Sequence, residues 1–269
     1  MPTIYVVATP IGNLEDISLR ALCILREVNL IAAEDTRKTK RLLTTYNIKT
    51  RMTSYHEHNK WAKLDYILGY LKEGDVALVS EAGTPSISDP GYELIVTASQ
   101  RGIPVVPIPG PSVVTTALAI SGLATDRFTY LGFLPRKVGN RHRLLASMAN
   151  EHGTLIVFES PHRLLATLND MLLILGDRRL AVCRELTKVH EEIFRGRISQ
   201  TIKHFTEPRG EFTLVIEGTE EKSKPLLTED IERQLQQMRI SGITAKEAIA
   251  KVGGETGLSK KELYQSWIK

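Results

Sequence analysis

The sequence predicts an α/β protein made of two α/β domains and a small helical tail. Short β-branched runs alternate with segments of helical periodicity, the alternation restarts after SGLATDR, and the end of the chain carries helical signals alone. Such alternation is typical of βαβ units, in which parallel strands are covered by helices. With 269 residues, of which 42% are hydrophobic, the chain is long enough for two domains with buried cores.

The first domain is predicted at residues 1–122. Its strands are expected where apolar and β-branched residues run together, at TIYVVAT, NLIAA, VALVS and IPVVPI. The helices between and after these strands are expected at SLRALCILREV, TRKTKRLLTTY, residues 58–71, YELIVTASQRG and VVTTALAISG. This order of elements predicts a mostly parallel sheet covered by helices.

The second domain is predicted at residues 123–218. Strands are expected at TYLGFL, TLIVF, LAVCREL and FTLVIEG, and helices at RLLASMAN and HRLLATLNDMLLIL. The polar stretch TEEKSKP at 219–225 is expected to be a linker, because it offers no apolar residue to a core.

The tail is predicted at residues 226–269 and reads as three short helices. Thr244 with Glu247, and Ser259 with Glu262, have the spacing of capping boxes, in which the two side chains satisfy each other's backbone amides at the start of a helix.

Prolines recur just past the predicted strands, in Thr9-Pro10, Asp89-Pro90, Gly110-Pro111 and Ser160-Pro161. In the last three pairs a good capping residue precedes proline at a first helical turn, so we expect Asp89 to be a helix N-cap. In an open α/β sheet, however, loops that leave the carboxyl ends of strands also form the ligand crevice.

Capping does not explain the AGTPSI segment, where Gly83 permits close backbone approach to a ligand. Glu81 beside it either faces a ligand or is a solvated loop carboxylate.

Several common site motifs are absent from the sequence. No GxGxxG follows the first strand and no GxxxxGK[ST] occurs, so neither a standard dinucleotide site nor a P-loop is predicted. No GxSxG elbow occurs, so covalent hydrolase chemistry is unsupported. Cys23 and Cys183 lie in separate apolar runs, which predicts buried free thiols and no structural metal. The N-terminus lacks a basic leader and no apolar stretch has membrane-spanning length, so we expect a cytoplasmic protein without a membrane segment.

Positive charge gathers in three short clusters, although the net charge is a modest +4 and the pI is about 9.0. The clusters are AEDTRKTKR (33–41), PRKVGNRHR (135–143) and RELTKVHEE (184–192). Charge held on turns in this way suits contact with the phosphates of a nucleic acid. A solvated basic face, with Asp35 as the N-cap of the following helix, explains the first cluster equally well.

Seven motifs follow one another along the chain, namely VATPIGNLEDISLRA, AEDTR, AGTPSISDPG, PGPSVVTTALAISGL, GFLPRK, ESPHR and RELTKVHEE. In this order they resemble the tetrapyrrole-methylase superfamily, and more narrowly its ribose methyltransferases of 16S ribosomal RNA. The resemblance covers residues 2–218 and continues more weakly through the tail. It implies a homodimer in which S-adenosylmethionine binds in the cleft between the two α/β domains. It also implies that the product is methylated on the 2′-oxygen of a cytidine at position 1402 of 16S rRNA in the small ribosomal subunit.

The resemblance also implies residues for the methyl donor. The positions are Ile11, Gly12, Glu81, Gly83, Thr84, Ile87, Ser112, Val113, Phe158, Phe212, Thr213 and Leu214. The family more often has aspartate where this chain has Glu81. Methyl transfer from a sulfonium is an in-line displacement, so catalysis consists mostly of aligning two bound groups in a desolvated cleft. The charge-free AGTPSI and PGPSVV loops suit a cationic donor.

A base or polarising cation should help to activate the acceptor hydroxyl, and the candidates in the remaining motifs are Asp35, Glu185 and Lys188. The candidates for RNA contact are Arg37, Lys38, Lys40, Arg41, Arg136, Lys137, Arg141, Arg143 and Arg184. Two alternatives stay open. One is a methylase of the same superfamily that acts on a corrinoid ring, which would not need so broad a basic rim. The other is a non-catalytic RNA-binding protein that uses the helical tail.

Overall fold

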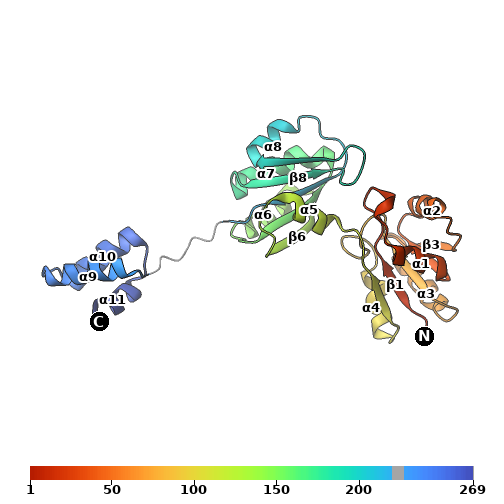
Figure 1. Cartoon of the computed structure of the whole chain (residues 1–269), viewed down its shortest axis with the longest axis horizontal. Coiled ribbons are helices and arrows are strands. Elements are labelled where there is room, and N and C mark those ends of the chain that lie inside the picture. Colours follow the sequence, from red (N-terminus) through yellow and green to blue (C-terminus); the bar gives the residue numbers. More distant parts are fainter. Residues whose placement is uncertain (220–226, 269) are drawn as a thin grey trace. The chain divides into compact units, whose positions relative to one another are not determined.

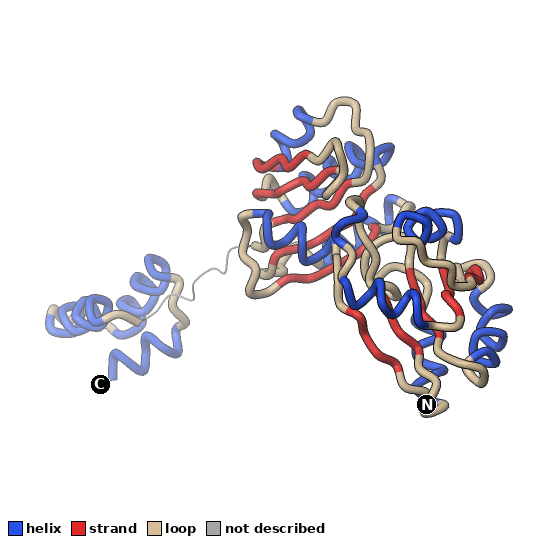
Figure 2. The backbone as a smooth tube through the Cα atoms, turned by 45° about the vertical axis from the view of Figure 1, so that its right-hand side comes forward, coloured by secondary structure: helices blue, strands red, loops and turns tan. Residues whose placement is uncertain are grey.

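The computed structural model describes residues 1–219 and 227–268, and the chain divides into two units at about residue 219 (Figure 1). The predicted linker at 219–225 lies, apart from Thr219, outside the described residues. The first unit holds two five-stranded sheets, and Figure 2 shows their strands in red with helices in blue beside them. The predicted boundaries between the three domains stay predictions.

The first sheet is parallel, with the strand order β3-β2-β4-β1-β5. Its strands are β1 (Ile4–Val7), β2 (Leu30–Ala33), β3 (Met52–Ser54), β4 (Val76–Val79) and β5 (Val105–Ile108). The connecting helices are η1 (Leu14–Asp16), α1 (Leu19–Glu27), α2 (Thr36–Thr45), α3 (Lys60–Tyr70) and α4 (Tyr92–Gln100). The predicted strands and helices of this region are confirmed, and β3 is an additional strand that was not predicted.

Helices cover both faces of this sheet, because successive side chains of a strand point to opposite faces. Ile31 and Ala33 of β2 pack with residues of α1 and α2, whereas Leu30 and Ala32 pack with residues of α3 and α4. All four residues of β2 are buried, which explains why the strand reads as an unbroken apolar run.

The second sheet is mixed, with the order β6-β7-β10-β8-β9. Its strands are β6 (Phe128–Phe133), β7 (Thr154–Glu159), β8 (Arg179–Arg184), β9 (Glu192–Arg197) and β10 (Phe212–Ile216), and only the β6 and β7 pair is parallel. Helices α6 (Val138–Ser147), α7 (Leu164–Leu175) and α8 (Ile198–His204), with the short η2 (Pro161–Arg163), accompany it. Neither β9 nor α8 was predicted, and α6 begins before the predicted RLLASMAN segment.

Helix α5 (Val113–Ser121) connects the sheets and packs on the second one. Its residues Ala117 and Leu118 join a core with Ile156, Ala181 and Val215, on the face opposite the core that α6, α7 and α8 build. We call the first sheet with α1 to α4 the N-terminal lobe, and the second sheet with α5 to α8 the C-terminal lobe.

The described part of the tail consists of α9 (Glu229–Ile240), α10 (Ala245–Thr256) and α11 (Lys260–Ile268), as predicted. Both capping boxes form, because Thr244 and Glu247 exchange hydrogen bonds and Ser259 and Glu262 do the same. The three helices share a small core of their own. Among residues 1–219 and 227–268, no helix is long and apolar enough to cross a membrane.

The prediction that Asp89 caps α4 is wrong. The helix begins at Tyr92, and its N-cap is Gly91, whose φ of 149° is open to glycine alone among common residues. The other proline pairs also differ, since α5 is preceded by Ser112 rather than Gly110, while Ser160 does precede Pro161 at the start of η2. The Asp89 carboxylate is therefore free for another role.

The two cysteines differ in environment, and the expectation that both are buried is wrong for Cys23. Cys23 is exposed on α1, whereas Cys183 is buried in β8 and burial raises the pKa of its thiol to about 11. An aromatic disulfide reagent should therefore react quickly with one thiol per native chain and with both thiols in denaturant. A Cys23→Ser variant should show no fast phase, and two fast thiols in the native protein would contradict this assignment.

Candidate functional site

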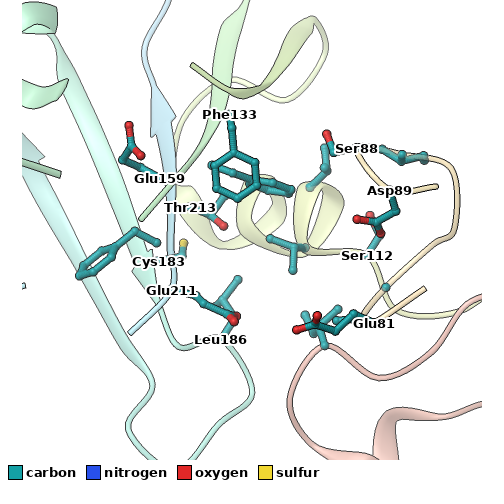
Figure 3. Close-up of a pocket in the computed structure, with 18 of the residues that line it drawn as sticks. Glu81, Ser88, Asp89, Ser112, Phe133, Glu159, Cys183, Leu186, Glu211 and Thr213 are labelled. Atoms are coloured by element: carbon teal, nitrogen blue, oxygen red, sulfur yellow. The ribbon is translucent and has the colours of Figure 1, made fainter. Parts of the chain in front are cut away.

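A cavity of about 370 Å³ lies between the two lobes of the first unit (Figure 3). The N-terminal lobe contributes the loops that follow β1, β2 and β4, and the segment between β5 and α5 closes the same side. Because β4, β1 and β5 are neighbours in a parallel sheet, the loops at their carboxyl ends meet at one edge. The C-terminal lobe contributes the ends of β6, β7, β8 and β10.

The loop after β4 is held in an unusual backbone conformation. Gly83 exchanges two backbone hydrogen bonds with Thr9, of 2.9 and 3.0 Å, and has a φ of 77°. Ser86 and Ser88 have φ values of 66° and 65°, in the left-handed region that non-glycine residues rarely enter. Such backbone strain is frequent at functional sites, where the surrounding structure maintains it.

Two contacts join the lobes beside the cavity. At one, Asn13 N donates to Thr187 Oγ1 at 2.9 Å, next to Gly12. A Cβ atom on Gly12 would lie 2.5 Å from Thr187 Oγ1 and 2.8 Å from the carbonyl oxygen of Leu186, so glycine is needed for this approach. At the other contact, the hydroxyls of Ser88 and Tyr130 are 2.7 Å apart.

Aromatic rings form part of the wall on the C-terminal lobe. Phe133 and Phe158 line the cavity and meet edge to face with ring centroids 5.7 Å apart. Phe133 is 58% exposed, so much of its ring is open to the solvent on the cavity side. The pair therefore offers an apolar surface to a flat ligand.

The cavity is acidic. Its lining includes five carboxylates, Glu34, Glu81, Asp89, Glu159 and Glu211, and no lysine, arginine or histidine of the described residues lines it. The AGTPSI and PGPSVV segments are free of charged residues, as expected, but the cavity that they help to line is not. A cavity of this charge favours a cationic ligand.

Two of these carboxyl groups have raised pKa values. Burial raises the pKa of Asp89 to about 7, with a further contribution from the charge of Glu34, while a hydrogen bond from Ser80 opposes the shift. Burial also raises the pKa of Glu34, whose Oε2 atom accepts a 3.0 Å hydrogen bond from Glu81 N. Glu81 itself forms an ion pair with Lys38.

The structure brings most of the predicted donor residues together around the cavity. Those that line it are Ile11, Glu81, Gly83, Thr84, Ile87, Ser112, Val113, Phe158, Phe212 and Thr213. Gly12 lies instead at the contact between the lobes. Leu214 is fully buried in the core under α6, α7 and α8, because it points to the face of β10 opposite Thr213.

Sequence reasoning missed other lining residues, notably Glu34, Asp89, Phe133, Cys183, Leu186 and Glu211. Glu34 could have been found, since it directly follows β2 and lies within the first basic cluster. Phe133 likewise stands in the GFLPRK motif at a strand end.

The three predicted catalytic residues lie outside the cavity lining. Asp35 is the N-cap of α2 and accepts from Arg37 N at 2.8 Å, a hydrogen bond that holds the pKa of its carboxyl below the usual value. Lys188 Nζ lies 3.0 Å from Glu185 Oε1 and 2.8 Å from Glu211 Oε2. Burial opposes the charge of Lys188, but these hydrogen bonds outweigh it and raise the pKa of Lys188. Burial raises the pKa of Glu185, but the hydrogen bonds that its carboxylate accepts from Glu211 N and Lys188 outweigh this effect, so the pKa is lowered.

The residues predicted to contact RNA fall into two groups. The side chains that are exposed are Arg37, Lys38, Lys40, Arg41, Arg136, Lys137 and Arg143. Of those on α2, Lys38 lies at the cavity edge, where it forms an ion pair with Glu81. Arg141 is only 5% exposed and donates to Asp170 at 2.6 Å, and Arg184 is half-buried against Glu192. Arg141 therefore holds α6 against α7, which sets it apart from the exposed group.

Two α/β lobes that meet at an acidic, partly aromatic cavity define a two-lobed α/β enzyme with a small-molecule site. The family profile described as Tetrapyrrole (Corrin/Porphyrin) Methylases matches residues 3–202, and the chain belongs to this family. The predicted fold class and enzyme class are thereby confirmed. No three His, Cys, Asp or Glu side chains gather as a metal site within the described residues.

The similar proteins include ribosomal RNA small subunit methyltransferase I from Halalkalibacterium halodurans, which is 47% identical over 97% of this chain and 93% of its own length. The protein of that name from Thermotoga maritima is 51% identical over 82% of this chain and its full length. A solved structure of uroporphyrin III C-methyl transferase from Thermus thermophilus, 17% identical, has a TM-score of 0.59 over 80% of this chain and 97% of that chain. This last likeness concerns the fold alone.

Gly12→Ala should separate the lobes, because the added methyl group overlaps the Leu186 backbone. Overpacking of this kind costs about 1–3 kcal/mol, which urea unfolding of the purified protein can measure. Gly69→Ala is a matched control, since apart from the nearby backbone of α3 no atom lies within 4 Å of its added Cβ, and alanine favours a helix by up to about 1 kcal/mol. Equal stability of the Gly12→Ala protein and the wild type would contradict the proposed contact.

Proposed function

We propose that this protein transfers a methyl group from S-adenosylmethionine to the ribose 2′-oxygen of a cytidine in the 16S RNA of the small ribosomal subunit. The observation that carries the proposal is the similarity, along nearly the whole chain, to methyltransferases named for the ribosomal RNA of the small subunit. The homodimer and the cytoplasmic location that the resemblance implies stay predictions.

The chemistry of the cavity supports S-adenosylmethionine as the donor. Its volume of about 370 Å³ is within the range of small-molecule sites, roughly 300–1,000 Å³. Its acidic lining suits a ligand that carries a sulfonium charge, and Phe133 with Phe158 offers a surface for an adenine ring. Bound there, S-adenosylmethionine supplies an electrophilic methyl group on a cationic sulfur.

The chain's own residues contribute alignment and the exclusion of water. The strained loop from Gly83 to Ser88 presents backbone groups and hydroxyls to the cavity. The hydrogen bond between the Ser88 and Tyr130 hydroxyls holds one lobe against the other. Two groups held in this way react as if at high effective concentration. The exposed basic side chains of α2 begin at the cavity edge and are placed to contact the phosphates of an RNA chain.

The decisive experiment is to map ribose methylation in small subunits from a strain that lacks this protein, before and after treatment with the protein and the donor. One cytidine should gain a 2′-O-methyl group. A tetrapyrrole offered as the acceptor in parallel tests the corrinoid alternative, and methylation of the tetrapyrrole alone would overturn the RNA proposal.

Thr84→Arg should strongly weaken donor binding, because the longer side chain fills the cavity and brings a positive charge toward the sulfonium. We expect the donor Kd, measured by calorimetry, to rise on the order of 100-fold, since each tenfold corresponds to about 1.4 kcal/mol. Thr44→Arg introduces the same charge on the exposed surface of α2 and should leave the Kd unchanged. Unaltered affinity in the Thr84→Arg protein would refute the donor placement.

Lys40→Ala should weaken RNA binding without loss of donor binding. Loss of one phosphate contact should make the slope of log K against log salt shallower by about 0.7 to 0.9, as counterion release predicts. Arg101→Ala is the control, because Arg101 caps the C-terminal end of α4, whereas the cavity loop leads into the N-terminal end of this helix. Equal slopes for Lys40→Ala and Arg101→Ala would exclude Lys40 from the RNA surface.

A further inference from the structure

Asp89 is a cavity carboxylate without a neutralising cation. Three of the other acids have one, since Glu81 pairs with Lys38, Glu159 with Arg163 and Glu211 with Lys188. Within residues 1–219 and 227–268, neither Asp89 nor Glu34 forms an ion pair. Figure 3 shows the Asp89 side chain projecting from its loop toward the cavity.

The position of Asp89 is fixed by the residues on either side of it. Ser88 is held by its hydrogen bond to Tyr130 across the lobes, and Gly91 turns the chain into α4 with a φ of 149°. A Cβ on Gly91 would lie 2.9 Å from a methyl group of Leu78, so the turn packs tightly against β4. The carboxylate is therefore part of a rigid wall rather than of a loose loop.

We propose that Asp89 is the general base that accepts the proton of the acceptor hydroxyl while the methyl group is transferred. This inference rests on the function proposed above. As the new O–C bond forms, the S–C bond of the donor breaks and its electron pair stays on sulfur, which becomes a neutral thioether. The O–H electron pair stays on the acceptor oxygen, and the proton passes to the Asp89 carboxylate and then to water.

Asp89 is better suited to this step than the acids and the lysine outside the cavity. A carboxyl whose pKa is about 7 accepts a proton far more readily than Asp35 or Glu185, whose pKa values are lowered. Lys188 has a raised pKa and is therefore protonated near neutrality, which leaves it unable to act as a base.

The charged and titratable groups that face Asp89 come from several elements. Glu34 at the end of β2 adds negative charge, and the Glu81–Lys38 pair stands at the same cavity edge. Tyr130 of β6 has its own pKa raised by burial, with a contribution from the charge of Asp89, and remains a neutral hydroxyl. None of the described groups facing Asp89 outweighs the effect of its burial.

The test compares Asp89→Asn with the wild type on small subunits that lack the methyl group. We expect kcat to fall at least about 100-fold, the usual contribution of a general base. The donor Kd should rise by less than about tenfold, because Asp89 supplies only one of the charges that attract a cationic ligand. In the wild type, kcat/KM for the donor should rise tenfold per pH unit up to about pH 7 and then level, because the deprotonated carboxylate is the active form. The residual activity of Asp89→Asn should lack this rise.

Asp65→Asn is the matched control, since Asp65 is exposed on α3 and pairs with Arg101 far from the cavity, and it should retain wild-type activity. Asp89→Glu keeps a carboxylate and should recover part of kcat with its pH dependence. Retained donor binding shows that the variants are folded. A fully active Asp89→Asn protein, or one with normal kcat and weakened donor binding, would overturn the base assignment alone. A wild type that binds the donor but methylates no RNA would overturn the proposed function and the base with it.

Discussion

The backbone of the loop after β1 approaches the Leu186 carbonyl so closely that no side chain fits at position 12. The cavity depends on this approach, because each lobe supplies only one wall. The Ser88 and Tyr130 hydroxyls form a second junction, so the wall that carries Asp89 is tied to the lobe that carries Phe133 and Phe158. The parallel order of β4, β1 and β5 explains why three loops distant in sequence converge on the cavity.

Elements with strong periodicity or continuous apolar runs could be predicted from the sequence, whereas those stabilised by pairing partners could not. β2 and β4 read as unbroken apolar runs because both of their faces are buried. β9 reads as EIFRGR, and its two arginines are exposed at a sheet edge, so it carries no such signal. Ten of the twelve donor positions that the family resemblance implies line the cavity. Which side chains at a strand end point inward depends on register, as Leu214 illustrates.

Asp35 and Asp89 show why local rules cannot separate a cap from a site residue. Both precede a helix in sequence, and Asp35 does accept the amides of α2. At Asp89 the same rule fails, because Gly91 adopts a φ that lets the chain turn once more before α4 begins. The carboxylate then faces the cavity without an amide or a cation to satisfy it. That outcome depends on contacts with β4 and β6 that lie outside the local sequence.

Negative side chains line the cavity and positive side chains lie outside it, so the two substrates of the proposed reaction bind to neighbouring surfaces of opposite charge. The acids line the inside, while exposed lysines and arginines of α2 begin at the edge, so a cationic donor and a polyanionic acceptor are drawn to different surfaces. The folded-state pKa of Asp89, about 7, is above its ordinary value of 3.8. Its protonated form therefore stabilises the fold at low pH, and this stability is lost as the pH rises through about 7. A cation bound nearby favours the ionised form and offsets that loss, so the donor that brings the methyl group also prepares the base that the transfer requires.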